Sequence, residues 1–97
     1  MNQEVLRVVD LATNIELASP GAKWFIFGSF LRNPVLASDL DLLVQYSGPN
    51  QAALVRSTIS GLNACPPVHL ILLEAEEIEE FNFVEAQGAI QIFPEMD

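Results

Sequence analysis

Two aspartates, Asp39 and Asp41, stand two residues apart at the start of an apolar stretch that continues to about Tyr46. Successive side chains of a β-strand point to opposite faces, so both carboxylates would lie on one face, about 6.6 Å apart along the strand. Two carboxylates this close repel each other unless solvent or a cation separates them. Mg²⁺ prefers oxygen ligands and combines one or two carboxylates with substrate phosphates. The pair is therefore a candidate metal site, and the alternative is a pair of solvated surface charges.

Gly28 and Ser29 follow directly on Lys23–Phe27, a short aromatic run that is typical of a buried strand. A strand-to-helix junction presents unpaired backbone N–H groups at the positive end of the helix dipole, where an anion such as a triphosphate can bind. Gly28 permits a ligand to approach the backbone closely, and Ser29 is a suitable N-cap. A plain turn with a serine cap is the alternative interpretation.

The remaining pattern predicts the elements that would position these groups. Apolar residues at helical spacing predict a first helix over about 2–18, and apolar runs predict strands over about 23–27, 40–46, 68–73 and 89–93. Further helices are expected between Ser29 and Pro34, after the turn at 47–50, and over 74–80. We expect one α+β domain over residues 1–97, an α/β arrangement of two layers with a mixed β-sheet and helices mainly on one face.

One motif joins the two candidate features. A strand ending in Gly-Ser is followed, nine residues later, by Asp-x-Asp on the next strand, within the segments Phe25–Asn33 and Ser38–Val44. This combination resembles the signature of the DNA polymerase beta superfamily of nucleotidyltransferases, and the chain resembles its small members, the minimal nucleotidyltransferases. The predicted order of helices and strands also matches, so the resemblance covers most of the chain and implies a nucleotidyltransferase-like fold.

The resemblance implies Mg²⁺-dependent transfer of a nucleoside monophosphate from a nucleoside triphosphate, with ATP the expected donor. The acceptor would be a hydroxyl of a small molecule or of a partner protein. Asp39 and Asp41 would be catalytic and would hold the metal, and the nucleotide would be bound by Gly28, Ser29, Arg32 and Ser38. Minimal nucleotidyltransferases are often encoded beside a helical HEPN partner, so the resemblance also implies a HEPN-like or other protein partner.

The chain departs from the family pattern at two places. Family members often carry glycine after the arginine that matches Arg32, whereas this chain has Asn33 and Pro34; Arg32 is equally consistent with a solvated helix charge. Active members also bring a third carboxylate from a later strand, and that position holds His69 here. His69 could be the catalytic base, or a structural histidine in a site that has lost catalysis. Glu74, about 16 Å further along the strand, could instead supply the acid.

Loss of the third carboxylate leaves a second function open. In this alternative the chain is a catalytically impaired relative that acts as a nucleotide-binding or antitoxin-like module of a toxin–antitoxin pair. The acidic run 74–80 is explained by glutamates favoured near a helix start and by a solvated helix face, and the alternative is a docking surface for a basic partner protein.

The formal net charge is −9, with four basic residues against thirteen acidic ones. Because affinity for nucleic acid depends on Lys and Arg neutralising phosphates, this balance argues against unassisted binding to DNA or RNA. No apolar run has bilayer-spanning length, the first residues lack a signal-peptide pattern, and the lone Cys65, expected to be an apolar filler, cannot form an internal disulfide. We expect a cytoplasmic protein without a membrane partner. The hydrophobic fraction of 51% suggests apolar surface for a partner or a second copy.

Overall fold

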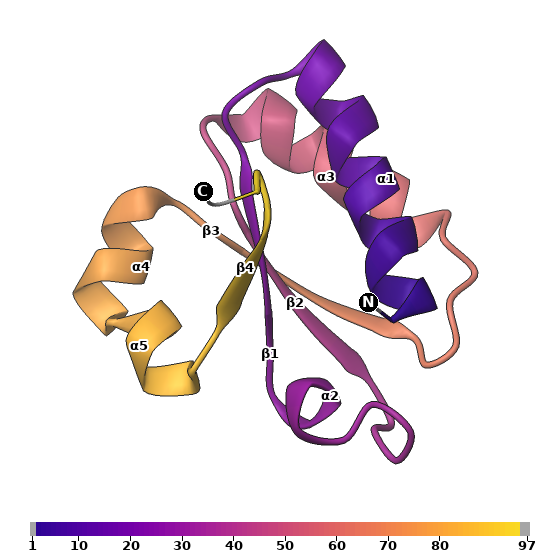
Figure 1. Cartoon of the computed structure of the whole chain (residues 1–97). Coiled ribbons are helices and arrows are strands. Elements are labelled where there is room, and N and C mark those ends of the chain that lie inside the picture. Colours follow the sequence, from indigo (N-terminus) through magenta and orange to yellow (C-terminus); the bar gives the residue numbers. More distant parts are fainter. Residues whose placement is uncertain (1, 96–97) are drawn as a thin grey trace.

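The computed structural model describes residues 2–95, and its chain alternates helices with strands (Figure 1). The elements follow in the order α1 (Gln3–Ala18), β1 (Lys23–Phe27), α2 (Ser29–Arg32), β2 (Leu40–Gln45), α3 (Pro49–Ser60), β3 (Val68–Leu73), α4 (Ala75–Phe81), α5 (Phe83–Gln87) and β4 (Ile90–Phe93). The predicted α+β class is confirmed. No helix within residues 2–95 combines the length and the apolar character needed to cross a membrane.

The four strands form one mixed sheet in the order β3-β2-β1-β4. β1 pairs antiparallel with both β2 and β4, whereas β2 and β3 run parallel, joined by the crossover helix α3. The register places Asp41 opposite Phe27 of β1 on one side and opposite His69 of β3 on the other. The N-terminal end of β2 therefore brings together residues from three strands.

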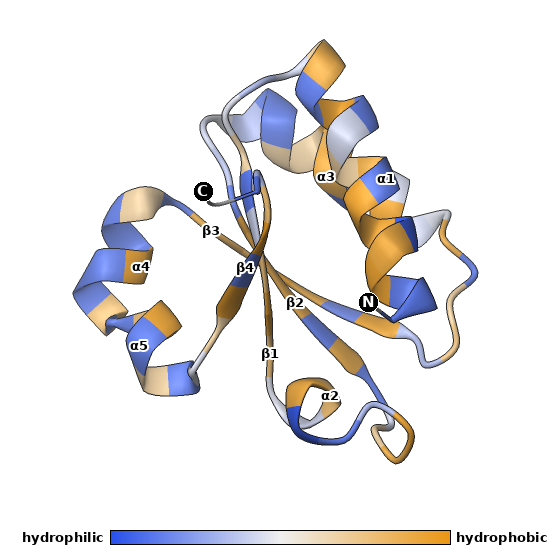
Figure 2. Cartoon of the chain, in the orientation of Figure 1, coloured by the Kyte–Doolittle hydropathy of each residue, from blue (hydrophilic) through white to orange (hydrophobic). Residues whose placement is uncertain are grey.

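The two long helices, α1 and α3, cover one face of the sheet (Figure 1). Apolar and polar residues alternate along both helices (Figure 2), and the apolar stripes contribute to the larger core. Fully burying one such side chain stabilises the fold by about 1.5–3 kcal/mol. The largest side chains that are completely buried in this core are Trp24, Ile26, Leu40, Leu42, Val8, Val44 and Val55. Helices placed mainly on one face were predicted, and this prediction is confirmed.

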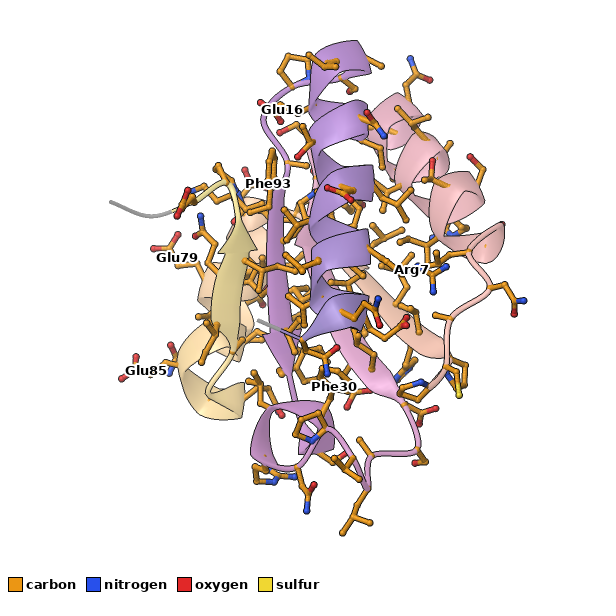
Figure 3. The ribbon with its side chains drawn as sticks, turned by 45° about the vertical axis from the view of Figure 1, so that its right-hand side comes forward. Arg7, Glu16, Phe30, Glu79, Glu85 and Phe93 are labelled. Atoms are coloured by element: carbon orange, nitrogen blue, oxygen red, sulfur yellow. The ribbon has the colours of Figure 1, made fainter. Side chains whose placement is uncertain are left out.

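A smaller core lies on the opposite face, where α4 and α5 pack over part of the sheet (Figure 1). Its centre is Phe25, Phe27 and Leu43, and Phe27 meets Phe83 of α5 edge to face with ring centroids 5.1 Å apart. Glu79 and Glu85 point away from this core into solvent (Figure 3). Helix α5 was not predicted, because five residues are too few to establish a helical period.

Two local predictions were wrong. Ser29 is the first residue of α2 and not its N-cap; the cap is Gly28, because the chain reverses there at positive φ. Cys65 is exposed and does not fill a core position, because the segment between α3 and β3 runs over the surface. Helix α2 is instead anchored by Phe30, which is 4% exposed and packs in the larger core (Figure 3).

Candidate active site

Gly28 lies where β1 turns into α2, with φ 78° and ψ −156°. L-residues with a side chain rarely adopt this positive φ. A Cβ atom added to Gly28 would also collide with the carboxylate of Asp41, whose Oδ2 atom occupies that space. The absence of a side chain at Gly28 therefore lets the Asp41 carboxylate lie directly against the backbone of the Gly-Ser turn.

Asp41 is held at this point by its neighbours in the sheet. Leu40, Leu42 and Val44 are fully buried in the larger core, so the alternate residues of β2 face the other way. Leu43 lies on the same face as Asp41 and is covered by the smaller core. The Asp41 side chain is 20% exposed, and it opens to solvent beyond the edge of that core.

His69 is brought to Asp41 by the parallel pairing of β2 and β3. Its Nδ1 atom lies 3.2 Å from Asp41 Oδ1, and its side chain is 62% exposed. His69 is therefore not a histidine enclosed in the core. The Asp41 carboxylate thus contacts Gly28 through one oxygen and His69 through the other.

Asp39 precedes β2 and is exposed, and within residues 2–95 no hydrogen bond or ion pair engages its carboxylate. By continued alternation it belongs to the Asp41 side of the strand. No three His, Cys, Asp or Glu side chains of the described residues gather closely enough to hold a metal ion. Asp39, Asp41 and His69 thus form a contacting pair with a neighbouring free carboxylate.

The other predicted nucleotide-binding residues lie around the same turn. Ser29 and Arg32 begin and end α2, Ser38 lies in the loop before β2, and all three side chains are exposed. The departure at Asn33 and Pro34 leaves an ordered turn, because the carbonyl of Asn33 accepts hydrogen bonds from the N–H groups of Leu36 and Ala37 at 3.2 and 3.1 Å.

Glu74 lies at the other end of β3 and cannot supply the third carboxylate. The register pairs His69 with Asp41 near the start of β3. Leu73, the residue before Glu74, pairs with Gln45 at the other end. The backbone N–H of Glu74 donates to Glu77 at 3.0 Å at the start of α4. About 16 Å of strand separates Glu74 from the position of His69.

Comparison with protein-family models, with curated proteins and with solved structures finds no match for this chain. The resemblance to minimal nucleotidyltransferases therefore depends on the motif and on the order of its elements.

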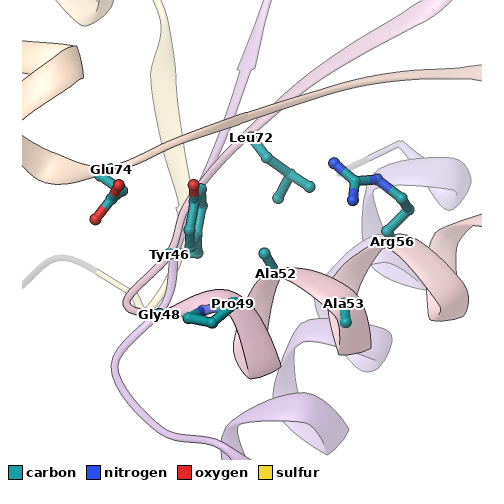
Figure 4. A pocket seen from close by; sticks show the side chains of 8 residues that line it. All are labelled: Tyr46, Gly48, Pro49, Ala52, Ala53, Arg56, Leu72 and Glu74. Atoms are coloured by element: carbon teal, nitrogen blue, oxygen red, sulfur yellow. The ribbon is translucent and has the colours of Figure 1, made fainter.

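A second feature was not anticipated from the sequence. A hollow of about 430 Å³ lies between α3 and the C-terminal ends of β2 and β3, away from Asp41 (Figure 4). Its walls carry Tyr46, Arg56 and Glu74. No sequence motif joins these residues, since they meet only when α3 crosses over and packs beside β3.

Proposed function

We propose that this chain is a nucleotidyltransferase that moves a nucleoside monophosphate from a nucleoside triphosphate, ATP by first choice, to an acceptor hydroxyl. The observation that supports this proposal is the seating of the Asp41 carboxylate on the side-chain-free backbone of Gly28. It couples the two halves of the motif, the Gly-Ser turn and the Asp-x-Asp strand, in one place.

The donor set fits Mg²⁺, because it offers carboxylate oxygens from Asp39 and Asp41 and leaves further positions for phosphate oxygens and water. When bound there, Mg²⁺ would neutralise charge on the reacting phosphates. Gly28, Ser29, Arg32 and Ser38 surround the same turn and would hold the phosphates, as the resemblance implies.

His69 is suited to the role of general base. If its proton resides on Nδ1, that N–H donates to Asp41 Oδ1 and leaves the Nε2 lone pair free. Nε2 would accept the proton of the acceptor hydroxyl while the hydroxyl oxygen forms a bond to the α-phosphorus of the nucleoside triphosphate. The bond between the α-phosphorus and the bridging oxygen would break, and pyrophosphate would leave. Asp41 would orient the ring, as carboxylates do for catalytic histidines.

The test uses ATP labelled at the α-phosphate, Mg²⁺, and candidate acceptors that include the product of the neighbouring gene. Wild type should transfer the label, and Asp39→Ala combined with Asp41→Ala should reduce transfer by about 100-fold or more. Glu76→Ala combined with Glu79→Ala removes the same charge from exposed positions of α4 and should leave transfer unchanged. Equal labelling by wild type and the double aspartate variant would refute the proposal.

A second candidate function is a nucleotide-binding or antitoxin-like module without turnover. It is favoured by the Asp41–His69 contact, because an imidazole occupies one carboxylate oxygen where active relatives bring a third acid. Calorimetry with ATP and Mg²⁺ separates the two candidates: metal-dependent binding without label transfer supports the module. In either case the partner would be a HEPN-like or other protein, and the cytoplasm is the proposed location.

Restoring the acid provides an independent readout. His69→Asp should lower stability in chelator, because a third carboxylate then faces Asp41, and should make the unfolding temperature depend on Mg²⁺. At Mg²⁺ near 100 times its dissociation constant the gain would be about 2.7 kcal/mol. His69→Asn is the uncharged control and should show less dependence on Mg²⁺. Identical Mg²⁺ responses of the two variants would show that this position does not belong to a metal site.

A further inference from the structure

The strand β3 is an edge of the sheet, and one row of its backbone polar groups faces away from β2. The N–H of Leu40 donates to the carbonyl of Pro67, and the N–H of Tyr46 donates to the carbonyl of Leu73. In a parallel ladder only alternate residues bond to the neighbouring strand, so positions 67, 69, 71 and 73 face β2. The N–H and C=O groups of Val68, Leu70 and Leu72 therefore point outward, and no strand within residues 2–95 pairs with them.

Within β3, three common protections against strand addition are missing. Natural edge strands are blunted by lysine, proline or bulges. Between Val68 and Leu73 there is neither lysine nor proline, and the pairing with β2 is regular. The only polar side chain in β3 is that of His69, on the opposite face from Val68, Leu70 and Leu72.

Two hollows that share Arg56 lie between β3 and α3, and together they are called the groove here. One part, of about 410 Å³, is lined by Ile59, Leu62, Val68 and Leu70, and the other is the hollow of about 430 Å³ that contains Leu72. Arg56 of α3 lines both parts. The side chains of Val68, Leu70 and Leu72 thus form the floor of the groove, and their backbones form its open edge.

The charges along the groove have a definite order. The end near Val68 is apolar, Arg56 stands between the two parts, and Glu74 lies across the second part from Arg56, beside Tyr46 (Figure 4). Among the described residues no carboxylate forms an ion pair with Arg56. From Val68 to Glu74 the groove therefore presents an apolar, then a basic, then an acidic position.

We propose that this groove binds an extended segment of a partner protein, which adds to β3 as a further strand. Backbone hydrogen bonds would supply affinity, and alternate side chains would supply specificity. Some side chains of the bound segment would face α3. Complementarity requires these to be apolar opposite Val68 and Leu70, acidic beside Arg56 and basic beside Glu74. Antiparallel pairing is the more stable arrangement, so the segment reads basic-x-acidic-x-apolar.

Charge disfavours a second copy of the chain as the occupant. Each copy carries a net charge of −9. Two-fold pairing of β3 with itself would also bring two Arg56 side chains to the same region, since this residue stands near the middle of the groove. Like charges so placed oppose association.

The probe is a fluorescein-labelled peptide, Thr-Lys-Thr-Glu-Thr-Leu-Thr-Val-Thr, titrated with the whole chain and followed by anisotropy. It should bind at least about 10-fold more tightly than a peptide with Lys and Glu exchanged. Two further peptides are N-methylated at alternate residues, one at the odd positions and one at the even positions. One of them should lose binding and the other should keep it, because only one set of N–H groups faces β3.

Arg56→Glu should weaken binding of the probe by about 10-fold and strengthen binding of a peptide with Lys in place of Glu. Lys23→Glu makes the same change of charge at the start of β1 and should leave both affinities unaltered. The proposal would be overturned if the peptide with Lys and Glu exchanged bound as tightly as the probe. It would also be overturned if the two N-methylated peptides bound equally tightly. A concentration-dependent dimer that competes with the probe would also overturn it, in favour of a second copy.

Discussion

Gly28 and Asp41 depend on each other because one space serves both residues. The carboxylate of Asp41 fills the volume that a side chain at Gly28 would need. The turn also imposes φ 78° on Gly28, and such strained conformations cost of order 1–3 kcal/mol for residues with a side chain. Gly28 therefore both adopts the positive φ of the turn and leaves room for the carboxylate of Asp41, the candidate catalytic residue.

Gly28→Ala should lower the free energy of unfolding by about 1–3 kcal/mol and displace Asp41. In an Asp41→Ala background the same substitution should cost less, with a coupling free energy of about 0.5–3 kcal/mol. Urea unfolding of the four proteins in this cycle measures the coupling.

Gly48→Ala is the matched control, since Gly48 has φ 83° and an added Cβ meets no atom within 4 Å. Its cost should be the same with and without Asp41. A cost of Gly28→Ala that is likewise independent of Asp41 would show that the two residues are not coupled.

At the scale of elements, one buried polar side chain ties α3 to the loop between α1 and β1. Gln51 is 3% exposed. Its Oε1 accepts from the N–H of Ser47 at 2.7 Å, and its Nε2 donates to the carbonyls of Ser19 and Pro20, each at 3.0 Å. A hydrogen bond of this kind contributes about 0.5–1.5 kcal/mol to stability. Gln51 therefore sets where α3 begins relative to α1.

Gln51→Leu should reduce the free energy of unfolding by about 2–4 kcal/mol, because leucine fills the space but cannot form these three hydrogen bonds. Asn50→Ala, at an exposed neighbouring position, should change it by less than about 0.5 kcal/mol. Thermal or urea unfolding provides the measurement. If the two substitutions had equal effects, the hydrogen bonds of Gln51 would not stabilise the fold.

At the scale of the whole molecule, acidic residues outnumber basic ones by thirteen to four. Apart from the contact of His69 with Asp41, one ion pair joins an acidic to a basic side chain within residues 2–95. It is formed by Arg7 and Glu4. Arg7 is well exposed, and such surface pairs contribute little. Mutual repulsion of the unpaired carboxylates therefore opposes folding, and salt should screen it.

Raising NaCl from about 0.02 to about 0.5 M should increase the free energy of unfolding by about 1 kcal/mol at neutral pH. Glu76→Gln combined with Glu79→Gln removes two charges from the acidic helix α4 and should reduce this dependence on salt. Differential scanning calorimetry at several salt concentrations measures both effects. A decrease in stability with added salt would contradict this expectation. So would an equal dependence of stability on salt concentration for the wild type and the double Gln variant.

Local pattern predicted the strands β1 and β3 to the residue, and the burial of Leu40, Leu42 and Val44 follows the two-residue period of a strand. These features follow from the alternation and continuity of apolar side chains, which any sheet buried on both faces must respect. The same alternation placed Asp41 and Leu43 on one face of β2. Helix α5 was beyond such reasoning, because its five residues gain their order from packing Phe83 on Phe27.

The sequence by itself determined the elements other than α5, the Gly-Ser and Asp-x-Asp positions, and the presence of histidine in place of the expected acid. Only the tertiary structure decided that His69 contacts Asp41, that Glu74 lies at the far end of β3, and that Arg56 stands over an open edge. The reason is that strand register and helix packing join residues distant in the chain. Spacing along a sequence specifies the face on which a side chain lies but not which strand or helix it will meet.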